Sequence, residues 1–247
     1  MAIKTNTPTA TAPRNATRVD PAASVTPSTG SDGRARVIIE AVAPTVPDGP
    51  FAAKRSVGET ARVEADIFCD GHDAIAAVVR HRKCGSEQWT EVRMAHFDND
   101  RWAAEFDLTA EGACEFVVEA WVDHFATWQR DLRRRAAAGQ DLTTEYLIGA
   151  ALIEHAIGDK PAHADLRQFA LRLRKATDPQ RSEIALDERL TTLMAQCDPR
   201  RFAVQTQTHR IWVDRERARF SSWYELFPRS TGKDERTHGT FRDVIGR

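Results

Sequence analysis

Two pairs of residues with metal-ligand chemistry lie close together in this sequence. Cys69 and His72 are separated by two residues, and His81 and Cys84 repeat that spacing. Cysteine and histidine at such spacings are common zinc ligands. The residues between the pairs have the pattern of an extended strand, in which about nine residues at ~3.3 Å each put His81 on the order of 30 Å from His72. We therefore favour two polar strand ends with half-buried thiols, assign no metal, and rank a zinc-dependent regulator last.

Trp121 is a second side chain with a chemical use. It lies on the strand face that carries Val117, Glu119 and Asp123, whereas the apolar face holds Phe116, Val118, Ala120 and Val122. An exposed indole flanked by carboxylates can stack on the apolar face of a sugar ring. The alternative, which we favour, is that a helical layer packs over this tryptophan.

The sequence lacks the short motifs that mark common types of catalytic site. It contains no Gly-rich phosphate loop and no Gly-x-Ser-x-Gly motif, and we expect no cofactor. The arginines at positions 130, 133, 134 and 135 have acidic residues close by, so we interpret them as a solvated helix face and not as a polyanion site.

Composition excludes several classes of partner. Lys+Arg 35 and Asp+Glu 36 give a formal net charge of −1, which provides no bulk attraction for nucleic acid or an anionic membrane. No apolar run approaches the ~20 residues of a membrane span, and the N-terminus lacks the apolar core of a secretion signal. Four widely spaced cysteines fit a chain with reduced thiols. We expect a cytoplasmic protein.

The first half of the chain changes character near residue 34. Residues 1–33 are dominated by Thr, Pro, Ala, Ser and Gly, which predicts a disordered tail. Residues 34–125 contain short apolar runs with period two, separated by turn residues. The strands we expect are 37–42, a run through Val63, Ala65 and Ile67, 75–81, 89–94, 102–106 and 114–122. This number of short antiparallel strands predicts an immunoglobulin-like β-sandwich.

Residues 126–199 have helical spacing and predict a helical insertion. The clearest helix covers 163–175, where apolar residues recur at i, i+3, i+4 and i+7. Residues 128–138, 141–157 and 182–196 suggest further helices, with a break at Asp178-Pro179. Residues 200–247 then form a linker, a strand over 220–227 and the start of a helix at 238, which is half of a β/α unit and cannot bury its faces alone.

The C-terminal segment carries a specific resemblance. Residues 211–230, which include Trp223-Tyr224-Glu225-Leu226-Phe227-Pro228, and residues 237–243 closely resemble the alpha-1,4-glucan:maltose-1-phosphate maltosyltransferases of glycoside hydrolase family 13. Upstream, residues 71–74, 118–123 and 126–128 and the segment around Trp102 are similar to that family's N-terminal sandwich and helical insertion. The resemblance covers roughly residues 36–247.

This resemblance implies a fold and an activity. The fold is a β-sandwich with a helical insertion, followed by the first unit of a (β/α)8 barrel. Family members move a maltosyl unit from alpha-maltose 1-phosphate to the non-reducing end of an alpha-1,4-glucan with retention and release phosphate. Retention needs a nucleophilic carboxylate and an acid/base about 5–5.5 Å apart. That pair belongs to later barrel strands, so we expect the isolated chain, which looks truncated, to be inactive, and the sandwich and helical region to form a homodimer.

Three residues near the end are weak substrate-binding candidates. Glu225, Arg229 and Ser230 lie at the C-terminal end of the expected barrel strand, where barrel enzymes build their sites. A structural ion pair of Glu225 with Arg219 or Arg229 is the alternative. The rival function for the whole chain is a stand-alone, non-catalytic dimerisation or glucan-binding module. Because an unpaired strand promotes aggregation, we expect a cut after Pro199 to improve solubility.

Overall fold

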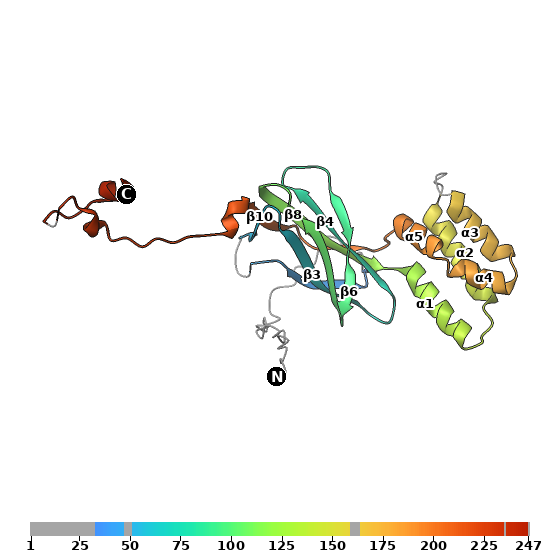
Figure 1. The fold of residues 1–247 in the computed structure, drawn as a ribbon. Coiled ribbons are helices and arrows are strands. Elements are labelled where there is room, and N and C mark those ends of the chain that lie inside the picture. Colours follow the sequence, from blue (N-terminus) through green and yellow to red (C-terminus); the bar gives the residue numbers. More distant parts are fainter. Residues whose placement is uncertain (1–32, 47–50, 159–163, 235, 247) are drawn as a thin grey trace, which may run out of the picture.

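A computed structural model describes residues 33–46, 51–158, 164–234 and 236–246. In Figure 1 a pair of β-sheets lies in the middle, five helices lie at one end of it, and the C-terminal segment extends from the other side. The tail expected at 1–33 falls, apart from Gly33, outside the described residues. Among the described helices, none is long and apolar enough to cross a membrane.

The smaller sheet has the strand order β1-β3-β7-β6, and all of its neighbours are antiparallel. The period-two pattern on β3 is confirmed, because Val63, Ala65 and Ile67 are buried while Arg62 is exposed. The strands are β1 (Val37–Ala43), β3 (Thr60–Cys69), β6 (Ala95–Asp98) and β7 (Arg101–Asp107).

The larger sheet has the order β2-β10-β8-β4-β5, with β9 also paired to β8. All of its pairs are antiparallel except β10 with β2, which run parallel. Its strands are β2 (Ala53–Ser56), β4 (Ile75–Lys83), β5 (Thr90–Arg93), β8 (Gly112–Val122), β9 (Val204–Gln205) and β10 (His209–Asp214).

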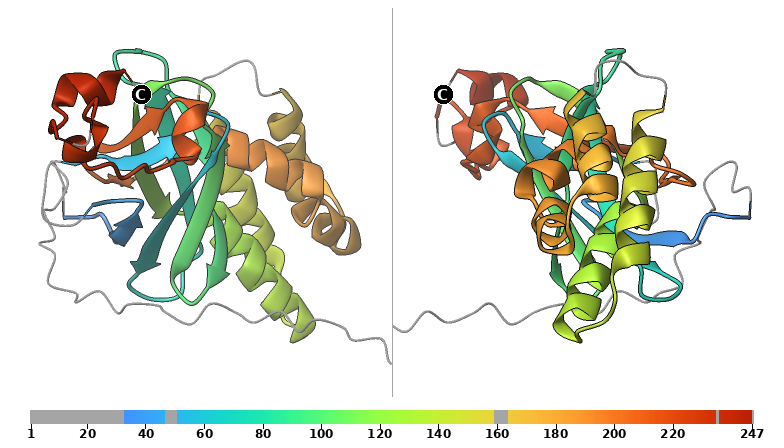
Figure 2. Two further views of the ribbon diagram at one scale, coloured as in Figure 1. Left: turned by 60° about the vertical axis from the view of Figure 1, so that its left-hand side comes forward. Right: turned by 90° about the vertical axis from the view of Figure 1, so that its right-hand side faces the viewer.

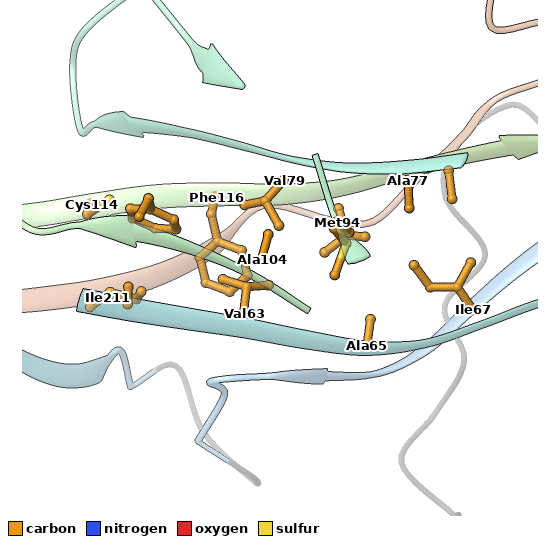
Figure 3. Packing of buried hydrophobic residues seen from close by; sticks show 14 of the residues in the cluster. Val63, Ala65, Ile67, Ala77, Val79, Met94, Ala104, Cys114, Phe116 and Ile211 are labelled. Carbon is orange, nitrogen blue, oxygen red and sulfur yellow. The ribbon is translucent and has the colours of Figure 1, made fainter. Parts of the chain in front are cut away.

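The apolar faces of the two sheets pack against each other. Figure 3 shows Val63, Ala65 and Ile67 of β3 facing Val79 and Phe116 of the larger sheet. Burial of these side chains removes apolar surface from water, which is the main stabilising contribution to a sandwich of this kind. The β-sandwich predicted from the alternating pattern is therefore present in the structure.

Strand β10 belongs to the sandwich, which corrects the sequence-based boundary. Residues 200–247 were expected to form a linker and the start of a barrel, yet β10 pairs with β8 on one side and β2 on the other. Ile211 and Val213 enter the core, while Trp212 between them points outward and is half-exposed. The strand was predictable from alternation, but its partners are more than 85 residues away along the chain, beyond the reach of a local pattern.

Five helices form a second unit with its own hydrophobic core. Their bounds are α1 (His124–Ala137), α2 (Thr143–Ile157), α3 (Ala164–Lys175), α4 (Asp178–Ala185) and α5 (Glu188–Cys197). Leu166, Phe169, Ala170 and Leu173 of α3 are buried in this core, as their spacing predicts. Figure 2 shows the helices grouped together beside the sheets.

The last predicted helix is divided in two. The sequence indicated one helix over 182–196, but α4 ends at Ala185. Asp187 then caps α5, where its side chain accepts a hydrogen bond from the amide of Arg189. The break expected at Asp178-Pro179 lies just before those residues, and Pro179 is in the first turn of α4. Proline is tolerated there because a first-turn amide has no helical acceptor.

The strand predicted over 220–227 is wrong for this structure. Those residues are extended without a strand partner, and Trp223 and Tyr224 are 92% and 93% exposed instead of filling a barrel interior. They lie between two short 3₁₀ turns, η1 (Glu216–Arg219) and η2 (Pro228–Thr231), and are followed by α6 (Phe241–Ile245). A strand needs a neighbour to accept its backbone hydrogen bonds, and propensity alone does not provide one.

Candidate functional site

The zinc-type residues are held at opposite ends of β4. Cys69 and His72 precede this strand, whereas His81 and Cys84 lie at its other end. Each thiol has a local contact: Sγ of Cys69 lies 3.8 Å from the carbonyl oxygen of Asp73, and Sγ of Cys84 lies 3.6 Å from Oε1 of Glu115. Within the described ranges, no group of three or more His, Cys, Asp or Glu side chains is arranged to hold a metal ion.

His81 has a role in packing. Its ring stacks on Phe106, with the two ring centroids 3.8 Å apart, and burial lowers the pKa of this imidazole. His209 on β10 stacks on Phe116 of β8 at 5.1 Å, and burial lowers its pKa as well. Both rings therefore contribute as neutral aromatic groups to the sandwich core.

Trp121 is fully buried, at 0% exposure. Its Nε1 donates a 2.7 Å hydrogen bond to Oδ2 of Asp198. The guanidinium carbon of Arg200 lies 4.5 Å from the centroid of the indole, and that of Arg93 lies 5.3 Å away. The ring has no free face for a sugar, so the sugar-stacking interpretation is wrong for this structure.

Trp121 is covered by different residues from those we expected. The helical layer was expected to provide it, but the groups on the ring come from Asp198 and Arg200, which follow α5, and from Arg93 on β5. Arg200 is also paired with Glu91 through two short hydrogen bonds of 2.6 and 2.8 Å. This polar cluster was not found by sequence reasoning, in which position 199 served only as the end of the helical region.

The buried carboxylate of Glu115 marks the outer face of the larger sheet. Arg82 binds it at 2.9 Å and Arg210 at 3.3 Å. These contacts to Arg82, Cys84 and Arg210 keep the pKa of this carboxyl below its ordinary value in spite of burial, which acts in the opposite direction. Because its lone pairs are already used by cations, Glu115 acts as a structural counter-charge in this sheet.

A shallow pocket of about 340 Å³ lies at the end of the sandwich away from the helices. Lys83, Asp107 and Phe106 are among its lining residues, and Cys114 lies at its edge. Burial raises the pKa of the Cys114 thiol to about 11, because the thiolate would lose its hydration there. This thiol is therefore protonated and unreactive at neutral pH.

The candidates Glu225, Arg229 and Ser230 do not converge on a common point. All three are exposed, and Arg229 approaches His238, with Nη2 3.3 Å from Nε2. The alternative ion pair of Glu225 with Arg219 or Arg229 is not formed in the described part of the chain. Arg219 instead donates to the carbonyl oxygen of Val57 at 2.6 Å.

The segment around Arg229 is nonetheless joined by local hydrogen bonds. The amide of Gly239 donates to the carbonyl oxygen of Arg229 at 3.2 Å, and Oγ1 of Thr231 donates to that of Pro228 at 2.7 Å. A side chain at Gly239 would overlap Pro228 and Thr231, so only glycine permits this close backbone contact. Thr240 and Asp243 complete a capping box at the start of α6.

Helix α2 presents apolar residues on its outward side as well as its buried one. Leu147 and Ile148 are exposed, while Tyr146, Ala150 and Ile153 on the other side enter the helical core. An all-round apolar helix is typical of one that is covered on both faces. We refer to Leu147 and Ile148 as the outer α2 face.

Comparison with known proteins gives a consistent family signal. The family model described as alpha-1,4-glucan:maltose-1-phosphate maltosyltransferase, domain N/S, matches residues 35–215. Among curated proteins, the enzymes of that name from Myxococcus xanthus and Chlorobaculum tepidum are 42% and 39% identical over 221 and 219 residues. A relative of the same name from Burkholderia pseudomallei is 38% identical over 247 residues.

The chain spans about a third of the length of the first two relatives. The match covers 85% of this chain and 33% of the Myxococcus protein, and 87% of this chain and 32% of the Chlorobaculum protein. For the Burkholderia protein the shares are 96% and 22%. The matched region contains both the sandwich and the five helices, together with strand β10.

Proposed function

This chain belongs to the alpha-1,4-glucan:maltose-1-phosphate maltosyltransferase family, and on that premise we propose that it supplies the non-catalytic sandwich and helical part of such an enzyme. The observation that carries the proposal is the match of residues 35–215 to domain N/S, together with 42% identity to the Myxococcus xanthus enzyme. We propose a cytoplasmic location, which the absence of a disulfide bond in the described part of the chain supports.

The reaction proposed for the complete enzyme is a retaining glycosyl transfer. A carboxylate attacks the anomeric carbon of alpha-maltose 1-phosphate, the bond to phosphate breaks, and phosphate leaves as a covalent maltosyl-enzyme forms. The terminal 4-hydroxyl of an alpha-1,4-glucan then attacks the anomeric carbon of that intermediate and loses its proton to the acid/base carboxylate. The bond between the anomeric carbon and the nucleophilic carboxylate breaks, which frees that carboxylate. We assign both carboxylates to the two thirds of the relatives that this chain does not cover.

The segment 220–245 is the docking surface that we propose for the catalytic part. Phe220, Trp223, Tyr224, Phe227 and Phe241 are large aromatic side chains that are exposed here, and exposed apolar groups concentrated in one segment are typical of an interface. Arg219 holds the start of this segment on the sandwich through Val57 and lies 3.7 Å from Glu59. Docking would bring Glu225, Arg229 and Ser230 to the substrate side, where they stay candidate contacts.

An exchange of domains tests this proposal. Residues 35–215 of this chain replace the matching region of the Myxococcus xanthus enzyme, and the chimera is assayed for phosphate release from alpha-maltose 1-phosphate with a maltooligosaccharide acceptor. The matched control carries the corresponding region of the Chlorobaculum tepidum enzyme. We expect both chimeras to release phosphate and to lengthen the acceptor by two glucose units at a time, and we expect this chain alone to do neither.

We propose that the outer α2 face contributes to a homodimer. Its exposed Leu147 and Ile148 would be buried against a second copy, which is the occupant that the family resemblance suggests. Light scattering after gel filtration tests this with the Leu147→Gln/Ile148→Gln double variant. We expect it to be monomeric where the original chain is dimeric, whereas Ile245→Gln, an exposed apolar site in α6, leaves the dimer intact.

A further inference from the structure

The sandwich and the helices are joined by polar contacts at two crossings of the chain. Their hydrophobic cores share no residue, and in the described ranges no strand makes substantial contact with any of the helices α1 to α5. Figure 1 shows the narrow connection between the two units. The chain enters the helices at Asp123, directly after β8, and returns at residues 198–203. The orientation of the helices must therefore be set at these crossings.

The first crossing is a short turn around Asp123. Its side chain caps α1 by accepting a 2.8 Å hydrogen bond from the amide of Ala126, and its amide donates to the carbonyl oxygen of Ala74 at 2.8 Å. Oγ1 of Thr127 accepts a 2.8 Å hydrogen bond from the amide of Ala74. The start of α1 is thus tied to the loop before β4 at one point, as a hinge would be.

The second crossing is fixed by Asp198 and Arg200. One oxygen of the Asp198 carboxylate accepts from Trp121 Nε1 at 2.7 Å, and the other accepts from the amide of Arg200 at 2.9 Å. Both terminal nitrogens of Arg200 then bind Glu91 on β5, and Nη1 lies 3.4 Å from Glu119 on β8. The guanidinium also lies over the Trp121 ring.

The backbone at this crossing requires that support. Arg200 has φ +47, in the left-handed region that residues with a Cβ seldom adopt. Such a conformation persists only where surrounding contacts determine it. A bidentate arginine–carboxylate pair next to a buried aromatic ring is a strong directional contact of this sort. Without these arginine contacts, the turn at 198–203 is held on the sheet by the Asp198–Trp121 hydrogen bond, by Ala203 packed against Trp121, and by β9 directly after it.

We propose that Arg200 is a latch: its contacts with Glu91 and Trp121 fix the orientation of the helical unit on the sandwich, and their release lets the helices turn about Asp123. The latch joins the end of α5 to β5 and β8, while the hinge joins α1 to the loop before β4. This inference goes beyond the proposed transferase role and stands on the contacts of these residues alone.

Residual dipolar couplings of the whole chain test the latch. In the unmodified protein we expect the amide couplings of the strands and of the helices to fit a single alignment tensor. Arg200→Asn removes the guanidinium, and asparagine tolerates the left-handed backbone, so the turn gains no new strain. In the Arg200→Asn variant, we expect the couplings of the sandwich and those of the helices to fit two different alignment tensors. Arg189→Ala, which breaks an exposed ion pair with Asp165 inside the helical unit, is the control and keeps one tensor.

Glu91→Gln provides a second route to the same result. Glu91→Gln leaves the residues of the 198–203 turn unchanged and removes only the negative charge that pairs with Arg200. It therefore tests the latch even if Arg200→Asn does not give the spectrum of a folded protein. We expect it also to lose the common tensor. The latch is overturned if a folded Arg200→Asn or Glu91→Gln variant fits one tensor with the original orientation, or if the unmodified protein already needs two.

Discussion

The indole nitrogen of Trp121 donates a 2.7 Å hydrogen bond to a carboxylate oxygen of Asp198, a residue 77 positions further along the chain. Trp121 is fully buried in the larger sheet, and Asp198 caps the C-terminal end of α5. One contact thus joins the strand that leads into the helical unit to the segment that leads out of it. A second Trp–Asp contact, from Trp212 to Asp214 at 3.2 Å, lies on the exposed side of β10.

These two pairs give the first prediction. Asp198→Ala leaves a buried indole N–H without its acceptor, which costs about 1–3 kcal/mol in the free energy of unfolding. Asp214→Ala removes a surface contact with half-exposed Trp212 and Lys54, and we expect a much smaller loss because solvent screens this contact. Urea unfolding followed by circular dichroism measures both. Equal losses in the two variants would show that the burial of Trp121 has no energetic consequence.

The second prediction concerns Gly149 in α2. A methyl group there would overlap the ring of Trp128, whose Nε1 donates to the carbonyl oxygen of Glu145 at 2.9 Å. Gly149→Ala gains about 1 kcal/mol in helix propensity, but displacement of a packed indole costs about 1–3 kcal/mol, and we expect a net loss.

Thermal unfolding of Gly149→Ala is compared with that of the Gly149→Ala/Trp128→Phe double variant. The smaller ring makes room for the methyl group, so the loss caused by Gly149→Ala should be smaller in the Trp128→Phe background than in the original chain. A Gly149→Ala variant more stable than the original chain would contradict this packing.

The third prediction is a pH dependence of stability. Burial lowers the pKa of His81 and of His209 in the folded state, so below about pH 6.5, the ordinary histidine value, the unfolded chain binds more protons than the folded one. Stability therefore falls as the pH is lowered from 7 to 5. The urea midpoint should fall in this window, and less steeply in His81→Phe and His209→Phe.

The carboxylates paired with arginine change the stability at lower pH than the histidines do. The contributions of the two kinds of group can therefore be separated. Arg62 lowers the pKa of Glu64 and Arg200 lowers that of Glu91, so the stability from these pairs is lost only as the pH falls through those lowered values. A midpoint that stays constant from pH 7 to 5 would contradict the neutral, buried state of the two imidazoles.

The fourth prediction revises the expected effect of shortening the chain. A cut after Pro199 removes β9 and β10, which exposes the edge of β8 and the apolar core beneath it. A cut after Arg219 removes the exposed apolar segment but keeps β10 and the contact of Arg219 with Val57. We expect the chain of residues 1–219 to be more soluble than the full chain, and the chain of residues 1–199 to be less soluble than the full chain. Centrifugation of matched lysates measures this, and a soluble 1–199 chain would contradict the role of β10.

Strands and helices were predictable wherever the pattern of one segment decides its structure. Val63, Ala65 and Ile67 alternate with polar residues, as the residues of a half-buried strand do. The apolar residues of α3 recur with the period of a helix. The outcome for residues 220–227 differs because a strand also needs a partner. Their aromatic and apolar side chains favour an extended backbone, and the structure shows that backbone without a neighbouring strand.

The contacts around Trp121 could not be predicted for a related reason. The sequence places this tryptophan on the polar side of β8. A side chain on that side is either exposed to solvent or covered by another segment, and the pattern of β8 does not distinguish the two. Its cover comes from Asp198 and Arg200, which are distant in sequence and follow a helix. An Asp-Pro dipeptide after a helix is an ordinary stop signal, and no local property of it indicates a partner on a strand.

Our proposal that residues 35–215 act as domain N/S of a maltosyltransferase can be tested in one assay. Its most direct test is the initial rate of phosphate release from alpha-maltose 1-phosphate by the chimera with the Myxococcus xanthus catalytic part. We expect a rate within about tenfold of the Chlorobaculum control, equivalent to less than about 1.4 kcal/mol in activation free energy. A chimera that folds and assembles like the control but releases no phosphate would contradict it.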